Sequence, residues 1–479
     1  MKIPKTFNIG AASSAWQTEG WSGKKKGQDS YLDDWYKNEY FVWHEGKGPD
    51  IATDFMNRYQ EDIKLMKRIG LNSYRTSVNW ARFFTDYEQP IIDEDYAKHI
   101  DNVIDALIEA NIRPMIVIEH YEIPQALQKK YGGWNSRRVV ELYVKYAELL
   151  FKRYGDRVKD WFTFNEPIVP QTRIYLDAVR YPHIVDPKRW MQWNFHKVLA
   201  TAKVVKSYHQ LKQGGKIGII HNWEFAYPRS RKYQPDVLAA HQFDLLNNRL
   251  YTDPLILGSY SHELIELLKQ NKIMFDFKAE DLETIKNNRI DYIGLNLYKP
   301  TRVKEPEYSW NNNAAFNIRK YYSDFILPGR KYNTSRGWEI YAPMMYDLAM
   351  IIKKEYSNFP WFISENGIGI ENEQRFKNTE GIIQDDYRID YIQENLYWLI
   401  KAVNEGANCQ GYMLWAFTDN VSPMNAFKNR YGLIEIDLEH NLKRRLKKSA
   451  YWYAKLIKNR VLSDKSVYEY YSTFEENNR

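Results

Sequence analysis

Short apolar runs alternate with longer amphipathic stretches from one end of the chain to the other. Most of the short runs are almost continuously apolar, which is typical of parallel strands that are covered on both faces. In the stretch 59–70, by contrast, Ile63 and Met66 lie at helical spacing and Gly70 provides a stop signal. The pattern predicts strands at residues 7–12, 73–78, 113–119, 160–165, 216–221, 291–297, 361–364 and 411–417.

Eight strand–helix units in one chain are typical of a (β/α)8 barrel, which uses about 250 or more residues as one unit. We therefore predict an α/β protein with a single (β/α)8 barrel domain over residues 1–479. No Pro/Gly/Ser-rich linker and no fixed-period repeat interrupts the pattern. Three long connections, at 20–50, 167–187 and 299–338, are expected to surround the barrel mouth, where barrel enzymes carry their catalytic groups.

Composition narrows the class of protein only slightly. The net charge of +7 comes from 68 basic and 61 acidic residues spread along the chain. The densest basic run, 443–448, is expected to cover a solvated helix face, so no nucleic-acid partner is predicted. The 16 Trp and 38 Tyr residues either fill a large core or provide stacking platforms for sugar rings, and composition alone favours core filling.

Export and membrane signals are absent from the sequence as given. Polar residues and Pro4 interrupt the first residues, so the uninterrupted apolar stretch of a secretory signal is missing. No run approaches the roughly 18–20 apolar residues of a membrane span. The single cysteine, Cys409, fits a reducing compartment, and a cytoplasmic location is expected.

No cofactor or metal is expected either. Glycine-rich nucleotide-binding loops do not occur in a strand–helix context, and histidines such as His120, His196 and His209 lack the spacing of metal ligands. The single cysteine also excludes cysteine-based zinc sites.

Two glutamates stand at the ends of predicted buried strands. Glu166 follows the fourth strand in DWFTFNEP, and Glu365 ends the seventh in WFISENG. A single glutamate at a strand end is commonly a helix cap or a surface charge, but two at one barrel mouth suit glycoside hydrolysis. One carboxyl must be protonated and the other ionised. Arg75, at the end of the second strand, is expected to hold Glu365 ionised, so that Glu166 keeps its proton beside it.

Four motifs in the right order resemble the signature stretches of glycoside hydrolase family 1. They are SAWQTEG at 14–20, HYEIPQAL at 120–127, TFNEP and SENG, and the resemblance extends from residue 7 to residue 453. It implies a retaining β-glycosidase with Glu166 as acid/base and Glu365 as nucleophile. Retention requires carboxyl groups about 5–5.5 Å apart.

The resemblance also implies a sugar site at the barrel mouth. The implied ring-binding residues offer hydrogen bonds from amide and imidazole groups, a phenol to the nucleophile and an indole beneath the ring. Trp338 corresponds to the tryptophan on the leaving-group side. One departure is Tyr121, where the family usually has Trp. The matching positions are Gln17, His120, Asn165, Asn296, Tyr298 and Trp415.

The segment DNVSPMNAFKNRYGL, at 419–433, is similar to the branch of the family that acts on 6-phosphoglycosides. Ser422 stands where members acting on plain glucosides carry a glutamate, which would repel a phosphate. Tyr431 matches the branch, but Asn429 occupies the position of its phosphate-binding lysine. Either Lys428 reaches the phosphate or Asn429 and another cation such as Arg430 bind it, and Lys428 is favoured.

The sequence thus predicts retaining hydrolysis of a small phosphorylated β-glucoside, such as phosphorylated cellobiose or an aryl β-glucoside. Pro423 lacks the tryptophan ring typical of galactoside-6-phosphate enzymes, which favours the gluco configuration. A 6-phospho-β-galactosidase and an ordinary β-glucosidase stay open as alternatives, as does a non-catalytic sugar-binding barrel. The leaving group and a possible homo-oligomer are also left open.

Overall fold

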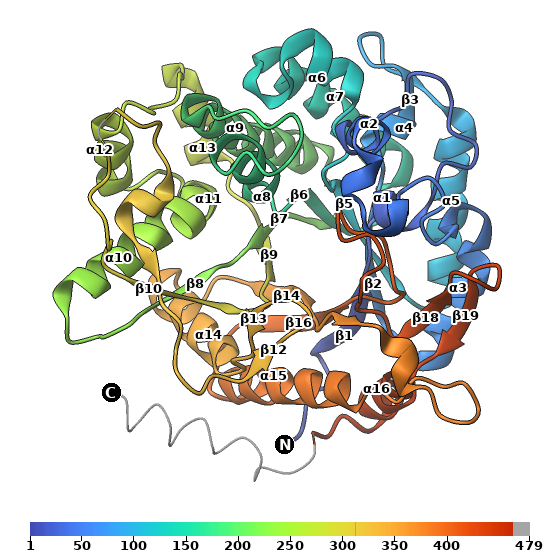
Figure 1. The fold of residues 1–479 in the computed structure, drawn as a ribbon. Coiled ribbons are helices and arrows are strands. Elements are labelled where there is room, and N and C mark those ends of the chain that lie inside the picture. The colour runs from blue at the N-terminus through green and yellow to red at the C-terminus, as the bar shows by residue number, and fades with distance from the viewer. Residues whose placement is uncertain (312, 463–479) are drawn as a thin grey trace.

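The computed structural model describes residues 1–311 and 313–462. Eight parallel strands close into a barrel, with the first strand paired to both the last and the second (Figure 1). Every predicted strand is confirmed to within two residues at either end. The barrel strands are β1 (Asn8–Ala12), β2 (Ser73–Ser77), β5 (Arg113–Glu119), β6 (Asp160–Asn165), β7 (Lys216–Asn222), β9 (Tyr292–Asn296), β14 (Trp361–Asn366) and β16 (Cys409–Trp415).

Helices ring the barrel on its outer side (Figure 1). The predicted domain end at residue 479 lies outside the described residues. No helix of the described chain is long and apolar enough to cross a membrane. The longer helices are α3 (Phe55–Ile69), α5 (Glu94–Glu109), α7 (Arg137–Tyr154), α9 (Pro187–Leu211), α10 (Gln234–Asp244), α14 (Met344–Glu355), α15 (Asp386–Asn404) and α16 (Lys448–Asn459); shorter ones include α1 (Ala15–Thr18), α2 (Tyr31–Asn38), α6 (Gln125–Tyr131), α8 (Ile168–Gln171), α12 (His262–Gln270) and α13 (Ala279–Asn287).

The helix predicted at 59–70 is α3, which ends where the sequence indicated. Gly70 adopts φ 84°, and its N–H bonds the carbonyls of Met66 and Lys67, as in a left-handed helix cap. The helix begins four residues earlier than predicted, at Phe55. Ile63 and Met66 face the core as expected from their spacing, whereas Lys67 is exposed.

The barrel interior is filled with large side chains, so the site above it has a solid floor. The Phe162 ring centroid lies 4.8 Å from that of Tyr292 and 5.4 Å from that of Phe362. Trp415 and Tyr431 belong to the same buried cluster. Seven tryptophans are fully buried elsewhere, so core filling accounts for much of the aromatic content.

The basic run 443–448 is not a solvated helix face, and that prediction was wrong. Its first residues form β19 (Lys443–Leu446), which pairs with β18 (Ile434–Asp437). The buried Arg444 guanidinium bonds the two carboxylate oxygens of Asp62 at 2.9 and 3.1 Å. Because Asp62 lies 382 residues earlier in the chain, the local charge pattern could not reveal this partner.

Lys447 at the end of the same run is also fully buried. Its ammonium bonds Glu373 and, at 2.8 Å, Asp419. Asp419 also accepts the backbone N–H of Gly432 at 2.9 Å. These buried charges therefore hold the segment 419–432, which follows the last barrel strand, against the barrel.

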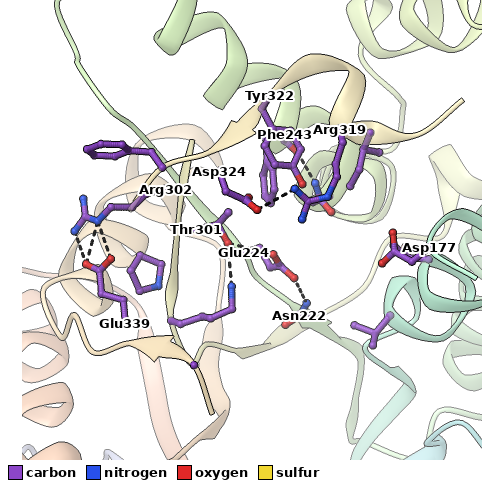
Figure 2. Close-up of a pocket in the computed structure, with 18 of the residues that line it drawn as sticks. Asp177, Asn222, Glu224, Phe243, Thr301, Arg302, Arg319, Tyr322, Asp324 and Glu339 are labelled. Atoms are coloured by element: carbon purple, nitrogen blue, oxygen red, sulfur yellow. Dashed lines mark hydrogen bonds and ion pairs between the residues drawn. The ribbon is translucent and has the colours of Figure 1, made fainter. Parts of the chain in front are cut away.

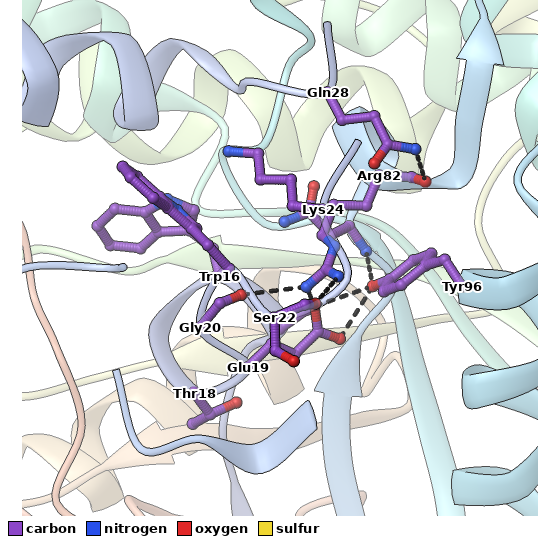
Figure 3. Close-up of polar contacts among 12 residues, drawn as sticks. Trp16, Thr18, Glu19, Gly20, Ser22, Lys24, Gln28, Arg82 and Tyr96 are labelled. Atoms are coloured by element: carbon purple, nitrogen blue, oxygen red, sulfur yellow. Dashed lines mark hydrogen bonds and ion pairs between the residues drawn. The ribbon is translucent and has the colours of Figure 1, made fainter. Parts of the chain in front are cut away.

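The connection after β1 is anchored by a second buried network (Figure 3). Glu19 accepts a hydrogen bond from the Tyr96 hydroxyl at 2.9 Å and pairs with Arg82 at 3.5 Å. Arg82 also donates to the carbonyls of Gly20 and Ser22, at 3.0 and 2.6 Å. The network fixes the end of α1 and the start of the 20–50 connection.

We expect Phe162→Ala to lower the free energy of unfolding by about 3–5 kcal/mol, because it empties the centre of the barrel floor. Urea unfolding followed by tryptophan fluorescence measures the change. Phe41, which is 71% exposed, supplies the control variant Phe41→Ala, expected to change stability little. Equal losses in the two variants would contradict a packed floor.

Candidate active site

The two glutamates reach the same place at the carboxyl ends of the barrel strands. Glu166 directly follows β6, and Glu365 is the last residue but one of β14. The negative charge of Glu365 is one of the causes that raise the pKa of Glu166. The charges of both carboxylates also help to raise the pKa of Tyr298. The structure thus brings together two acids that are 199 positions apart in the sequence.

Glu365 is held from both sides. Arg75 on β2 donates to Glu365 Oε1, and both side chains are buried. The Tyr298 hydroxyl donates to Oε2 at 2.6 Å. Arg75 also donates to the Ser13 carbonyl at 3.1 Å, which fixes the guanidinium. Each carboxylate oxygen therefore has a donor of its own, as an ionised nucleophile requires.

Glu166 has neutral partners instead. Tyr121 donates to its Oε2, and Asn296 Nδ2 donates to its Oε1 at 2.9 Å. Burial raises the pKa of Glu166 to about 7, and the charge of Glu365 acts in the same direction. The hydrogen bonds from Tyr121 and Asn296 oppose that rise. A carboxyl with this pKa can give up and take back a proton near neutral pH.

The backbone at both residues of the Tyr121–Glu166 pair lies in the left-handed region, with φ 76° and 43°. Such conformations are uncommon for non-glycine residues and concentrate at functional sites. The sequence marked Tyr121 as a departure from the tryptophan that is usual in the family. The structure shows that its hydroxyl takes over a donor role toward Glu166.

His120, Asn165 and Asn296 form a chain of polar groups beside the carboxylates. Asn165 Nδ2 lies 3.1 Å from His120 Nε2, and Asn296 Nδ2 donates to Asn165 Oδ1 at 3.2 Å. Burial lowers the pKa of His120 well below its usual value, and the charges of Arg75 and Lys197 add to this. The imidazole is therefore neutral. Asn296 Oδ1 is buried without a partner, which leaves an acceptor for a ligand hydroxyl.

The aromatic and amide candidates border the same space. The Trp415 ring stacks against that of His120, with centroids 6.1 Å apart, and Trp338 lies 5.8 Å from Tyr298. Gln17 donates to the Val421 carbonyl at 2.7 Å and accepts from Ser14. Its amide therefore braces the segment that carries Ser422.

The predicted phosphate-binding segment is well ordered by its own contacts. Ser422 exchanges backbone hydrogen bonds with Ala426, at 3.1 and 2.7 Å. Asn429 is buried, accepts from Asn425 at 2.7 Å and donates to the Ser335 carbonyl at 3.1 Å. Tyr431 is buried, with its ring 6.5 Å from that of Tyr298. Ser422, Asn429 and Tyr431 thus follow one segment, which reaches the partner of Glu365 at Tyr431.

The two cations that the sequence suggested for the phosphate both pair with acidic side chains of the protein. Lys428 is exposed and lies 3.5 Å from Glu371, and Arg430 lies 3.6 Å from Asp419. The structure instead brings Arg336 to this segment, with Nη1 3.4 Å from Asn429 Oδ1. Sequence reasoning missed Arg336 because it stands 93 positions away from Asn429. Its only local signal is its place two residues before Trp338.

Comparisons with known proteins identify the family. The model of glycosyl hydrolase family 1 covers residues 1–461. The chain belongs to glycosyl hydrolase family 1. It is 44% identical to the 6-phospho-beta-glucosidase GmuD of Bacillus subtilis, over 94% of this chain and 97% of that protein. It is 32% identical to the 6-phospho-beta-galactosidase of Clostridium acetobutylicum, over 97% and 98%. The family 1 β-glucosidase of Thermotoga maritima superposes with a TM-score of 0.87 at 28% identity, covering 96% of this chain and 99% of that one.

This glycoside hydrolase has a polar cavity beside the connection that follows β6 (Figure 2). Its volume is about 490 Å³, and its wall includes Ile168, two residues beyond Glu166 in the sequence, but neither Glu166 nor Glu365. Glu224 is central in it, accepting from Asn222 and Thr301, each at 3.3 Å. Two ion pairs, Arg302–Glu339 and Arg319–Asp324, also line the cavity. Such a surface suits a group that carries many hydroxyls.

No group of three or more His, Cys, Asp or Glu side chains gathers as metal ligands within residues 1–311 and 313–462.

We expect kcat/KM of this family 1 hydrolase to fall as the pH rises through about 7, because Glu166 then loses the proton that a leaving group needs. Tyr121→Phe removes a hydrogen bond that lowers the pKa of Glu166, so the alkaline limb should move to higher pH. Pre-steady-state and steady-state pH profiles with an alkyl β-glycoside measure both effects. A limb that stays in place in Tyr121→Phe would contradict the role of this contact.

Proposed function

We propose that this protein hydrolyses 6-phospho-β-D-glucosides to glucose 6-phosphate and a free aglycone, with retention of configuration. The observation that carries the proposal is the chemistry of the segment after β16. It carries Ser422 without an acid at that position, and Tyr431, whose ring lies 6.5 Å from that of Tyr298, the partner of Glu365. The guanidinium of Arg336 lies against the same segment. A relative that is 44% identical and named as a 6-phospho-beta-glucosidase supports the same substrate class.

The contacts support a double displacement. Glu365, held by Arg75 and Tyr298, attacks the anomeric carbon and forms a covalent glycosyl-enzyme. Glu166 protonates the glycosidic oxygen as the bond to the leaving group breaks. The same carboxylate then takes a proton from water, which attacks the anomeric carbon and releases Glu365. The pKa of about 7 for Glu166 suits both directions of proton transfer.

The glycone is held by the groups around the carboxylates. Trp415 lies beneath the sugar ring, and the neutral His120 with Gln17 bonds its hydroxyls. Asn165 is placed for the 2-hydroxyl, whose hydrogen bond strengthens in the transition state. The unpartnered Asn296 Oδ1 accepts a second hydroxyl from the same side.

The proposal extends to the location of the protein and to the sugar epimer. The protein works as a single catalytic domain in the cytoplasm, on a small phosphorylated substrate. Pro423 beside Ser422 favours the gluco over the galacto epimer, because it offers neither an indole ring nor a donor to an axial hydroxyl. A 6-phospho-β-galactosidase and an unphosphorylated-substrate β-glucosidase are the alternatives. The intact carboxylate pair argues against a barrel that only binds sugar.

The substrate class is tested by comparing 4-nitrophenyl β-glucoside with its 6-phosphate and with the galacto epimer. We expect the gluco 6-phosphate to have the highest kcat/KM. Ser422→Glu should lower kcat/KM for it by about 100-fold or more, because a carboxylate then faces the phosphate. Ser422→Ala is the matched control and should cost about tenfold or less. A wild-type preference for the unphosphorylated compound would refute the proposal.

The polar cavity supports a sugar as the preferred leaving group. Its centre is the Glu224 carboxylate with Asn222 and Thr301, while the aromatic side chains of its wall, such as Phe243 and Tyr322, lie around this polar centre. Carboxylate and amide groups bind sugar hydroxyls, whereas an aryl group leaves them unpaired. We therefore propose a phosphorylated disaccharide, phosphorylated on its non-reducing glucose, as the better substrate.

Glu224→Ala should lower the ratio of kcat/KM for phosphorylated cellobiose over that for phosphorylated phenyl β-glucoside by about tenfold, since a hydrogen bond to a charged group is lost. Coupled measurement of glucose 6-phosphate release follows both substrates. Glu280, which is exposed on α13, supplies the control variant Glu280→Ala. A parallel loss on both substrates would show that Glu224 does not select the leaving group.

A further inference from the structure

Arg336 lies on a hairpin that packs against the segment after the last barrel strand. The hairpin consists of β12 (Tyr332–Asn333) and β13 (Trp338–Glu339), with Gly337 at φ 69° in its turn. The Ser335 carbonyl accepts from Asn429 Nδ2 at 3.1 Å, and the Ser335 hydroxyl accepts the Glu371 N–H at 3.1 Å. These bonds tie the hairpin to the segment that carries Ser422 and Tyr431.

The guanidinium of Arg336 is placed between aromatic and polar groups. It lies 4.4 Å from the centre of the Trp338 ring, and its Nη1 is 3.4 Å from Asn429 Oδ1. Burial raises the pKa of Tyr431, and the charge and hydrogen bond of Arg336 oppose that rise. The Arg336 guanidinium is thus one of the groups that act on the Tyr431 hydroxyl.

The charge of Arg336 is not balanced by the protein. Of the described residues, no Asp or Glu forms an ion pair with it, and its Nε is buried without a hydrogen-bond partner. The two neighbouring cations differ, because Lys428 faces Glu371 and Arg430 faces Asp419. A partly buried guanidinium without a carboxylate is costly unless an anion binds it.

Asn429 explains how the cation comes to stand there. The position holds a neutral, buried side chain whose amide bonds Asn425, the Ser335 carbonyl and Arg336 itself. Asn429 therefore fixes the hairpin that carries Arg336 and does not itself provide charge. The cation comes from the connection after β9, and not from the segment after β16.

We propose that Arg336 is the cation that binds the 6-phosphate of the substrate, together with Ser422 and Tyr431. This inference rests on the proposed function and deepens it. The planar guanidinium offers two parallel N–H donors to a phosphate, which an asparagine cannot do. Trp338 holds the guanidinium plane in place by stacking and at the same time borders the leaving-group side. One hairpin thereby recognises both ends of the substrate.

The test compares Arg336→Gln and Arg336→Lys with Lys428→Gln and with the control Arg375→Gln. Arg375 is exposed and stacks on Phe376, with its guanidinium 4.7 Å from the ring centre. The readouts are kcat and KM for 4-nitrophenyl β-glucoside 6-phosphate, the same for the unphosphorylated compound, and inhibition by inorganic phosphate. Thermal unfolding of each variant accompanies them.

For Arg336→Gln we expect a loss in kcat/KM of about 100-fold on the phosphorylated substrate, mainly through KM, and a fall in the ratio of phosphorylated to unphosphorylated turnover. Inhibition by inorganic phosphate should weaken in parallel, and Arg336→Lys should recover part of the loss. Lys428→Gln and Arg375→Gln should stay within about threefold of the wild type.

Three outcomes overturn the inference. They are a loss below threefold in Arg336→Gln, an equal loss on both substrates, and a larger loss in Lys428→Gln. A wild-type enzyme that prefers the unphosphorylated substrate refutes the proposed function itself, and this result is separate because it is read before any variant is made.

Discussion

The buried ion pair between Arg75 and Glu365 is the interaction on which the rest of the site depends. Both side chains lie in the barrel mouth, where removing one partner would leave an unpaired charge at a cost of about 3–5 kcal/mol. The pair keeps an anion beside Glu166, and that anion adds to the effect of burial on the pKa of Glu166. One pairing thus separates the two carboxyl groups into a nucleophile and an acid.

Buried charge also determines the shape of the substrate pocket. Lys447, Glu373 and Asp419 form a network beneath the segment 419–432, and Arg388 joins it by bonding Glu373 and, at 3.2 Å, the Tyr431 carbonyl. These groups neutralise one another, so they hold the loop without offering charge to a ligand. The free positive charge comes from Arg336 on another connection. In the proposed phosphate site, the groups that support the segment are therefore different from the group that provides the positive charge.

The hydrophobic pattern predicted most of the fold, because a strand covered on both faces is a local property of the sequence. β5 and β6 match their predicted bounds, and α3 ends at Gly70 as expected. Both acids were also predicted, since each follows an apolar run directly. The prediction failed at residues 443–448, because whether a basic side chain is solvated or buried depends on partners such as Asp62 that lie far away in the sequence.

The sequence by itself determined the barrel, the glutamate pair at its mouth and the absence of a carboxylate at Ser422, since all three are encoded in residue types within or next to the strands. Only the tertiary structure decided which cation stands beside Tyr431 and that the Tyr121 hydroxyl reaches Glu166. Proximity between separate connections arises when the barrel closes and the loops pack on one another. A linear pattern carries no record of those distances, so electrostatic partners at the mouth become visible only in three dimensions.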